Sequence, residues 1–77
     1  MMRGLNMKYT VTFEYDDKAN VWIATSTDID GLVLEAETYD NLIEKVKYAV
    51  PELLALNGQP AASTLEIACS KRQLVYA

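Results

Sequence analysis

The side chains best suited to chemistry in this sequence are carboxylates, and their clearest spacing is Asp28-x-Asp30, followed by Gly31. This spacing occurs in calcium-binding loops, because hard cations prefer carboxylate oxygens as ligands. An EF-hand loop also needs further ligands, including a glutamate at its twelfth position, and the sequence does not supply it. A two-metal nuclease site would need carboxylates such as Glu14 and Glu35 to converge from different elements. Turn chemistry explains the aspartates more simply, so we expect no metal ligands.

Nucleophilic catalysis lacks its usual components. The sequence contains no histidine, which is the commonest general base, the commonest zinc ligand and the usual partner of a serine or cysteine nucleophile. The single cysteine, Cys69, falls on the apolar side of the last expected strand, where a small core residue is typical. The three glycines form no phosphate-binding loop. We therefore expect no catalytic residues, no cofactor and no enzymatic activity.

The charge is acidic and unevenly distributed. The net charge is −4, and the stretch from Glu14 to Glu44 holds nine carboxylates and one cation, Lys18. Nucleic-acid-binding proteins usually present a basic face to the phosphates, so direct DNA binding is not expected. This half of the protein would instead attract basic partners. The alternative interpretation is a solvated acidic surface that maintains solubility.

Hydrophobic periodicity predicts the elements that must position these side chains. Two-residue alternation indicates strands over residues 8–15, 21–27, 32–37 and 64–69. The polar turn after residue 15 predicts a hairpin between the first two strands. The order is therefore β-β-β-α-β, an α+β fold whose antiparallel-rich, four-stranded sheet has one helix on one face. We expect a single domain over residues 1–77 with an ordered core at about 7–70.

The expected helix begins after Thr38, a good N-cap, and ends before Asn57-Gly58. Its apolar stripe has helical spacing. The stripe consists of Leu42, Val46, Ala49, Val50, Leu53 and Leu54. Pro51 lies within this pattern and lacks an N–H donor, so we expect one kinked helix in preference to two helices.

One sheet face must remain uncovered by a single helix. Either Tyr9 with Phe13 or Trp22 with Ala24 is expected on it, and such exposed aromatic surface favours a homo-oligomer or a partner protein. Trp22 has an alternative role, which is simple packing under the helix. The apolar residues of 74–76 could extend a strand or contact a partner.

The cellular location is inferred from what the sequence lacks. No apolar run is long enough to span a bilayer, and the first residues contain no signal-peptide core. We therefore expect a cytoplasmic protein without a membrane partner. Met1, Met2 and Met7 are three candidate starts.

Several runs taken together resemble the HicB-like antitoxin domain of bacteria. They are Met7-Lys8-Tyr9-Thr10-Val11-Thr12-Phe13, Asn20-Val21-Trp22-Ile23-Ala24-Thr25-Ser26, and Asp28-Ile29-Asp30-Gly31-Leu32-Val33 with Glu37-Thr38 before the helix. Within that family the chain is most similar to a small stand-alone branch whose helix ends as Pro51-Glu52-Leu53-Leu54-Ala55-Leu56-Asn57-Gly58 does here. The resemblance covers residues 7–58.

The resemblance implies a fold like a degraded ribonuclease H, without the carboxylate site of that nuclease. It also implies a toxin–antitoxin role, since HicB-like antitoxins cover the active site and RNA surface of HicA, a small basic ribonuclease. Many HicB proteins carry a further C-terminal DNA-binding domain, and this sequence stops about where that domain would begin.

We therefore expect an antitoxin-like module that neutralises a small basic HicA-type toxin by occlusion. Expected partner-binding residues are Asp28, Asp30, Glu35 and Glu37 for steering and contact, with Trp22 as an anchor. The alternative is a stand-alone homo-oligomeric structural or regulatory domain with no toxin partner.

Overall fold

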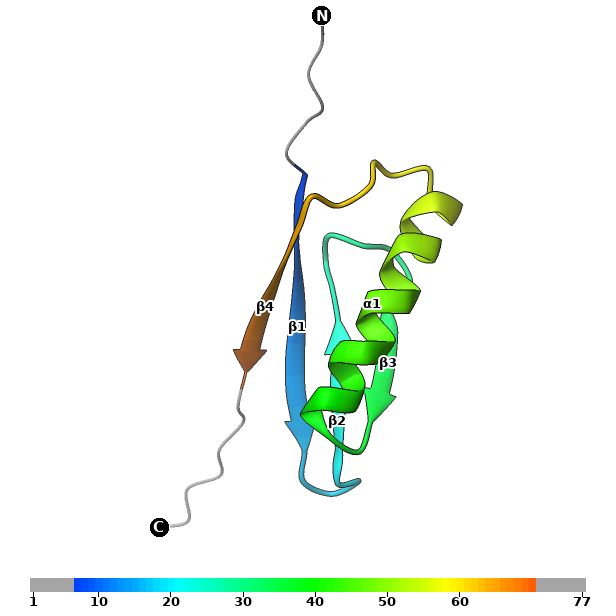
Figure 1. The fold of residues 1–77 in the computed structure, drawn as a ribbon. Helices are drawn as coiled ribbons and strands as arrows, with labels where there is room; N and C mark the ends of the chain where they lie inside the picture. The colour runs from blue at the N-terminus through cyan, green and yellow to red at the C-terminus, as the bar shows by residue number, and fades with distance from the viewer. Residues whose placement is uncertain (1–6, 71–77) are drawn as a thin grey trace, which may run out of the picture.

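The computed structural model describes residues 7–70 and has the predicted α+β order (Figure 1). Its elements are β1 (Lys8–Asp16), β2 (Val21–Thr25), β3 (Val33–Ala36), α1 (Tyr39–Leu56) and β4 (Thr64–Ser70). The predicted strand and helix segments are all confirmed, with ends shifted by up to two residues. The predictions for residues 74–76 and for the start at Met1 or Met2 lie outside the described residues.

The four strands form one mixed sheet in the order β3-β2-β1-β4. β2 is antiparallel to both β1 and β3, whereas β4 is parallel to β1. A parallel neighbour requires a crossover connection, and α1 supplies it. The connection is fastened to β1 by the Tyr9 hydroxyl, which donates to the Pro60 carbonyl at 2.7 Å.

The β1–β2 hairpin is set by its polar turn. Asp16 Oδ1 accepts from the backbone N–H groups of Lys18 (2.9 Å) and Ala19 (3.3 Å). Asn20 then takes a φ of 57°, a left-handed conformation that asparagine tolerates better than most residues. The turn brings Asp16 opposite Val21, which fixes the register of the whole ladder.

The helix begins and ends where its capping residues predict. The hydroxyl of Thr38 accepts from the backbone N–H of Asn41 at 3.1 Å. At the other end Gly58 has a φ of 69°, and the N–H of Gln59 returns to the Leu54 carbonyl at 2.8 Å. One helix continues through Pro51, as predicted. The bend at this proline stays a prediction.

The aromatic residues of β1 and β2 share a single sheet face, and the expectation of an exposed aromatic face is wrong. Phe13 lies opposite Ala24 and Tyr15 opposite Trp22, and directly paired residues project to the same side of a sheet. That side is the one packed against α1, so both candidate sets lie beneath the helix layer. The buried core comprises Tyr9, Val11, Phe13, Ala24, Ile29, Leu32, Ala36, Leu42, Val46, Val50 and Leu54.

The helix covers only part of this face. Its backbone lies over β2 and β3, and no Cα atom of α1 comes within 8 Å of one in β1 or β4. Cys69 is therefore exposed, although it occupies the apolar side of β4 as predicted. The interpretation of Cys69 as a core residue is wrong, because the backbone of α1 does not extend over that strand.

Candidate protein-binding surface

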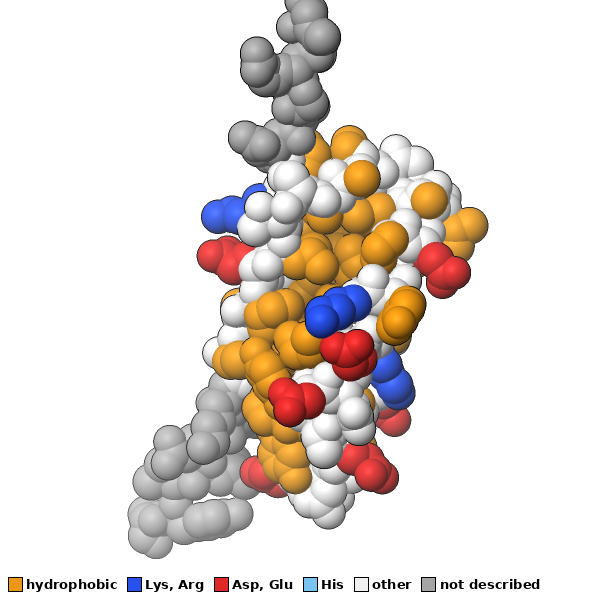
Figure 2. Space-filling model, viewed as in Figure 1, with side chains coloured by type: hydrophobic (Ala, Val, Ile, Leu, Met, Phe, Trp, Pro, Cys, Tyr) orange, Lys and Arg blue, Asp and Glu red, His pale blue; other side chains and the backbone are white. Residues whose placement is uncertain are grey.

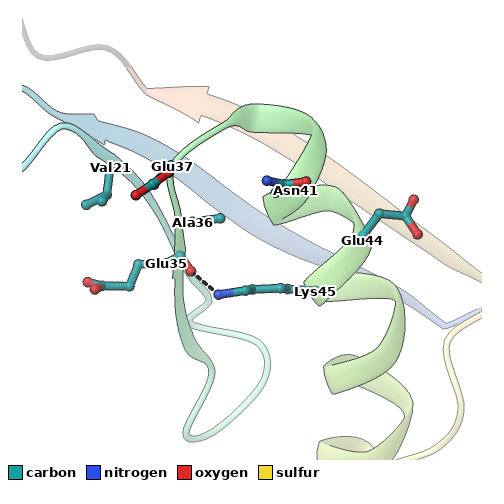
Figure 3. A pocket seen from close by; sticks show the side chains of 7 residues that line it. All are labelled: Val21, Glu35, Ala36, Glu37, Asn41, Glu44 and Lys45. Atoms are coloured by element: carbon teal, nitrogen blue, oxygen red, sulfur yellow. Dashed lines mark hydrogen bonds between the residues drawn. The ribbon is translucent and has the colours of Figure 1, made fainter.

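The sheet face opposite α1 is acidic. Strand alternation places Glu14 of β1, Glu35 of β3 and Glu66 of β4 on it, with Lys8 at the start of β1 as a cation on the same side. The Thr10 hydroxyl donates to Glu66 Oε1 at 3.4 Å, so β1 and β4 side chains meet on this side. Figure 3 shows Glu37, directly after β3, projecting to the same side as Glu35. We call Glu14, Glu35, Glu37 and Glu66, with the residues between them, the acidic face.

Apolar side chains lie between these carboxylates. Ile23 is directly between Glu14 and Glu35 across the three neighbouring strands. In the next row Val33 lies beside Thr25 and is 70% exposed. Binding surfaces on proteins commonly combine an apolar centre with a charged rim. The acidic face has this composition.

A groove of about 600 Å³ runs beside the acidic face, between the edge of β3 and the first turns of α1 (Figure 3). Lys45 Nζ crosses it and donates to the Glu35 carbonyl at 2.6 Å. The carboxylate of Glu44 points away on the other side of the helix, where it pairs with Lys47 at 3.1 Å. Within residues 7–70, neither Glu35 nor Glu37 forms an ion pair.

Asp28 is at the opposite end of the sheet and completes the backbone pairing of β1. Beyond the end of β2, its Oδ2 accepts from the Thr10 N–H at 2.7 Å. The Ser26 hydroxyl donates to the Thr10 carbonyl at 2.6 Å and accepts from the N–H of Asp28 at 3.0 Å. Two side chains thus replace the main-chain partner that β2 no longer provides. This role accounts for the aspartate without a ligand.

The loop that contains Asp30 is held by the end of the helix. Asn57 Nδ2 donates to the Asp30 carbonyl and Gln59 Nε2 to the Asp28 carbonyl, each at 2.9 Å. Gly31 has a φ of 83°, which an L side chain rarely adopts. The side chain of Asp30 is exposed, and no hydrogen bond joins its carboxylate to another described residue.

Trp22 lies on the helix-covered face, in a cluster of four aromatic rings. Its ring meets Tyr15 at 5.3 Å and Tyr39 at 5.4 Å between centroids, both edge to face. Tyr39 in turn meets Phe13 at 5.2 Å. The cluster fixes the first turn of α1 onto the sheet, which corresponds to the packing alternative for Trp22.

The phenol of Tyr39 is perturbed by its surroundings. Tyr39 is 36% exposed, and the partial burial of its ring together with the adjacent Cys69 thiol raises its pKa above the ordinary value, with a smaller contribution from Asp40. Loss of a proton would place a charge among apolar rings, and burial disfavours the charged form. The shift therefore affects the phenol only in alkaline solution.

The predicted partner-binding residues do not form one surface. Glu35 and Glu37 lie together, Trp22 is on the other face of the sheet, and Asp28 and Asp30 lie at the other end of the strands. Sequence reasoning missed the contributions of Ile23, Val33 and Glu66. The sequence shows which residues of each strand share a side, but only the register between strands shows which of these residues lie together on one face.

A second, apolar groove of about 630 Å³ separates the C-terminal half of α1 from the start of β4. Val50, Pro51, Leu54, Ala62 and Leu65 contribute to its lining. Figure 2 shows hydrophobic side chains gathered between the helix and β4, on the face that α1 leaves partly open.

Neither a metal site nor a membrane span is found in the part of the chain that the structure describes. No three His, Cys, Asp or Glu side chains of residues 7–70 gather closely enough to hold a metal ion. Among the same residues, no helix is both long enough and apolar enough to cross a bilayer.

The fold and this surface define a small α+β domain with a 3-2-1-4 mixed sheet, one covering helix and an open acidic face. The chain belongs to the family described as a domain of unknown function, DUF1902, which matches residues 8–77. It is similar to the crystal structure of the hypothetical protein TTHA1013 from the extremely thermophilic bacterium Thermus thermophilus. The two share 37% identity with a TM-score of 0.72, over 91% of this chain and 100% of that one. No curated protein matches significantly.

Proposed function

We propose that this protein is a non-catalytic, HicB-like antitoxin module that binds and occludes a small basic HicA-type ribonuclease. Glu35 and Glu37 would contact the basic partner, with Ile23 and Val33 as the apolar centre of the interface. Asp28 and Asp30 would add to the negative field from the end of the sheet, and Trp22 would support the fold beneath the surface.

The observation that carries this proposal is the composition of the acidic face. Four carboxylates share with the exposed Val33 and the half-buried Ile23 a face that no described element covers. The ammonium of Lys45 is bound to a main-chain carbonyl, so Glu35 and Glu37 are not paired with a described cation. A concentrated negative surface accelerates encounter with a basic protein and repels nucleic acid.

The alternative remains a stand-alone homo-oligomeric domain with no toxin partner. The outer edge of β4 has no partner strand within residues 7–70, which favours some form of self-association. The two functions differ in what the protein captures from its native cells. A small basic protein in near-equal amounts supports the antitoxin function, whereas recovery of copies of this chain alone supports the alternative.

The direct test uses the captured basic protein and a charge-reversed acidic face. Glu35→Lys with Glu37→Lys is compared with Glu44→Lys with Glu52→Lys, which changes the net charge equally at exposed positions of α1 outside the acidic face. We expect the first pair to slow association by about tenfold or more at low salt, because local charge governs steering. The control pair should change the rate by no more than about threefold.

Inhibition of the partner's ribonuclease activity is measured beside binding. The Glu35/Glu37 variant should restore RNA cleavage at protein concentrations where the wild type and the control suppress it. Equal effects of both pairs would show that only net charge matters, and the assignment of the acidic face would be wrong. A captured basic protein without ribonuclease activity would contradict the antitoxin function.

A further inference from the structure

The two outer edges of the sheet are protected very differently. The edge formed by β3 has only four residues, and Lys45 Nζ occupies the Glu35 carbonyl at 2.6 Å. Carboxylates of Glu35 and Glu37 stand beside this edge. Short length and charged side chains are the devices by which proteins prevent edge strands from pairing with other chains.

Among the residues that the structure describes, none gives the edge of β4 comparable protection. It is seven residues long, contains a single charged residue, Glu66, and has no neighbouring strand among the described residues on its outer side (Figure 1). On the helix side Leu65 and Ile67 are only half-buried and Cys69 is exposed, since α1 does not extend over them. A long, apolar and unprotected edge is suited to pairing with another strand.

We propose that β4 pairs in antiparallel fashion with β4 of a second copy of this chain, about a twofold axis at Ile67. Ile67 is the middle residue of Thr64–Ser70, so this register alone keeps all seven residues paired. It places Ile67 opposite its own copy and Leu65 opposite Cys69. Apolar side chains of β4 thus meet apolar side chains of its copy on the helix side.

The charges of β4 favour the same register. On the opposite face Glu66 lies across from Ala68 of the second copy, and Thr64 across from Ser70. A shift that centred the axis on Glu66 would bring two carboxylates directly opposite each other and leave five residues paired. With the axis at Ile67, the two glutamates are diagonal neighbours, about 7–8 Å apart instead of about 4.5–5.5 Å.

The paired sheet would have eight strands, with both helices on one side and both acidic faces on the other. The two grooves beside β3 would lie at its far ends, away from the interface. This inference does not depend on the proposed toxin partner, because it uses only the edge of β4. A small domain also gains stability from self-association, since its own core is limited.

Ala68 offers matched variants for the test. It is exposed on the acidic-face side of β4, so a charged side chain there need not disturb the core. Ala68→Lys would place an ammonium opposite Glu66 of the second copy at two symmetry-related positions, and Ala68→Glu would place a carboxylate there. We expect the dimer dissociation constant to fall about tenfold for the lysine variant and to rise about tenfold for the glutamate variant.

The dissociation constant is measured by analytical ultracentrifugation, with circular dichroism to verify the fold of each variant. A seven-residue edge buries little surface, so we expect a wild-type dissociation constant of about 1–100 µM. A wild-type protein that stays monomeric up to about 500 µM would overturn the proposal. A dimer indifferent to both Ala68 variants would also overturn it, because the interface would then lie elsewhere.

Disulfide trapping tests the register itself. Ile67→Cys in a Cys69→Ser background places two thiols opposite each other, at a Cα separation of about 4.5–5.5 Å that a disulfide tolerates. We expect covalent dimers from this variant under mild oxidation. Wild-type Cys69 lies opposite Leu65, four residues from its own copy, and should not cross-link comparably. Equal cross-linking through Cys69 would contradict the register.

Discussion

Lys45 Nζ lies 2.6 Å from the main-chain oxygen of Glu35, so a side chain from the second turn of α1 closes the outer edge of β3. The bond links the helix to the strand that it covers. It also directs the ammonium toward the backbone and leaves Glu35 and Glu37 without a described ion-pair partner. One lysine thereby affects both the stability of the sheet edge and the charge of the acidic face.

Replacement of this lysine is expected to weaken the fold modestly. Lys45→Met keeps most of the aliphatic stem but removes the donor, and we expect a loss of about 1 kcal/mol in the free energy of unfolding. Lys47→Met is the matched control, because its exposed pair with Glu44 contributes only about 0.3–0.5 kcal/mol. Urea denaturation measures the free energy of unfolding of both variants. Equal losses would show that the Lys45 hydrogen bond does not contribute more than an exposed ion pair.

The two aspartates of the β2–β3 loop should differ in their effect on stability. Asp28→Ala removes the acceptor of the Thr10 N–H, so we expect a loss of about 1 kcal/mol and faster hydrogen exchange at that amide. Asp30→Ala removes the same charge without a described hydrogen bond to its carboxylate, and should stay within about 0.5 kcal/mol. The comparison would fail if the Thr10 amide exchanged equally fast in both variants.

Trp22 is expected to act through stability. Trp22→Ala removes two edge-to-face contacts and the packing below the first turn of α1, at a cost of about 2 kcal/mol. Val33→Ala, at a highly exposed position, should change stability by less than about 0.5 kcal/mol. Thermal unfolding of both variants measures this difference. A Trp22 variant of wild-type stability would favour an exposed, partner-binding role for the ring.

Ionisation of the Tyr39 phenol is expected to lower the free energy of unfolding in alkaline solution. Its pKa is raised in the folded state above the ordinary value of 10.0, chiefly by burial and then by Cys69. The stabilisation from the neutral phenol is therefore complete below pH 10.0 and is lost as the pH rises through the folded-state pKa. Tyr39→Phe cannot ionise and should lose less stability over this range.

The urea midpoints of the wild type and of Tyr39→Phe are compared at about pH 9 and about pH 11. The ionisation of other residues affects both proteins alike, so a difference between them reports on the phenol. Parallel loss of stability in the wild type and in Tyr39→Phe would show that the phenol does not contribute. A smaller loss in the phenylalanine variant is the expected result.

Local sequence patterns determined the elements of this protein. Alternation at Tyr9, Val11 and Phe13 specifies a strand with one apolar side, because successive side chains project to opposite faces. Thr38 and Gly58 delimit the helix, because a hydroxyl caps the first N–H groups and glycine adopts positive φ. These effects act within a few residues, so the order β-β-β-α-β follows from the sequence alone.

Only the tertiary structure decided how the elements combine. The register that sets Phe13 against Ala24 placed the aromatic rings of β1 and β2 on one face and the glutamates of three strands on the other. The position of α1 over β2 and β3 left Cys69 exposed and β4 open. The bond between Asp28 and Thr10 joins residues 18 apart. Such pairings depend on which distant surfaces pack together, and no local pattern in the chain encodes that choice.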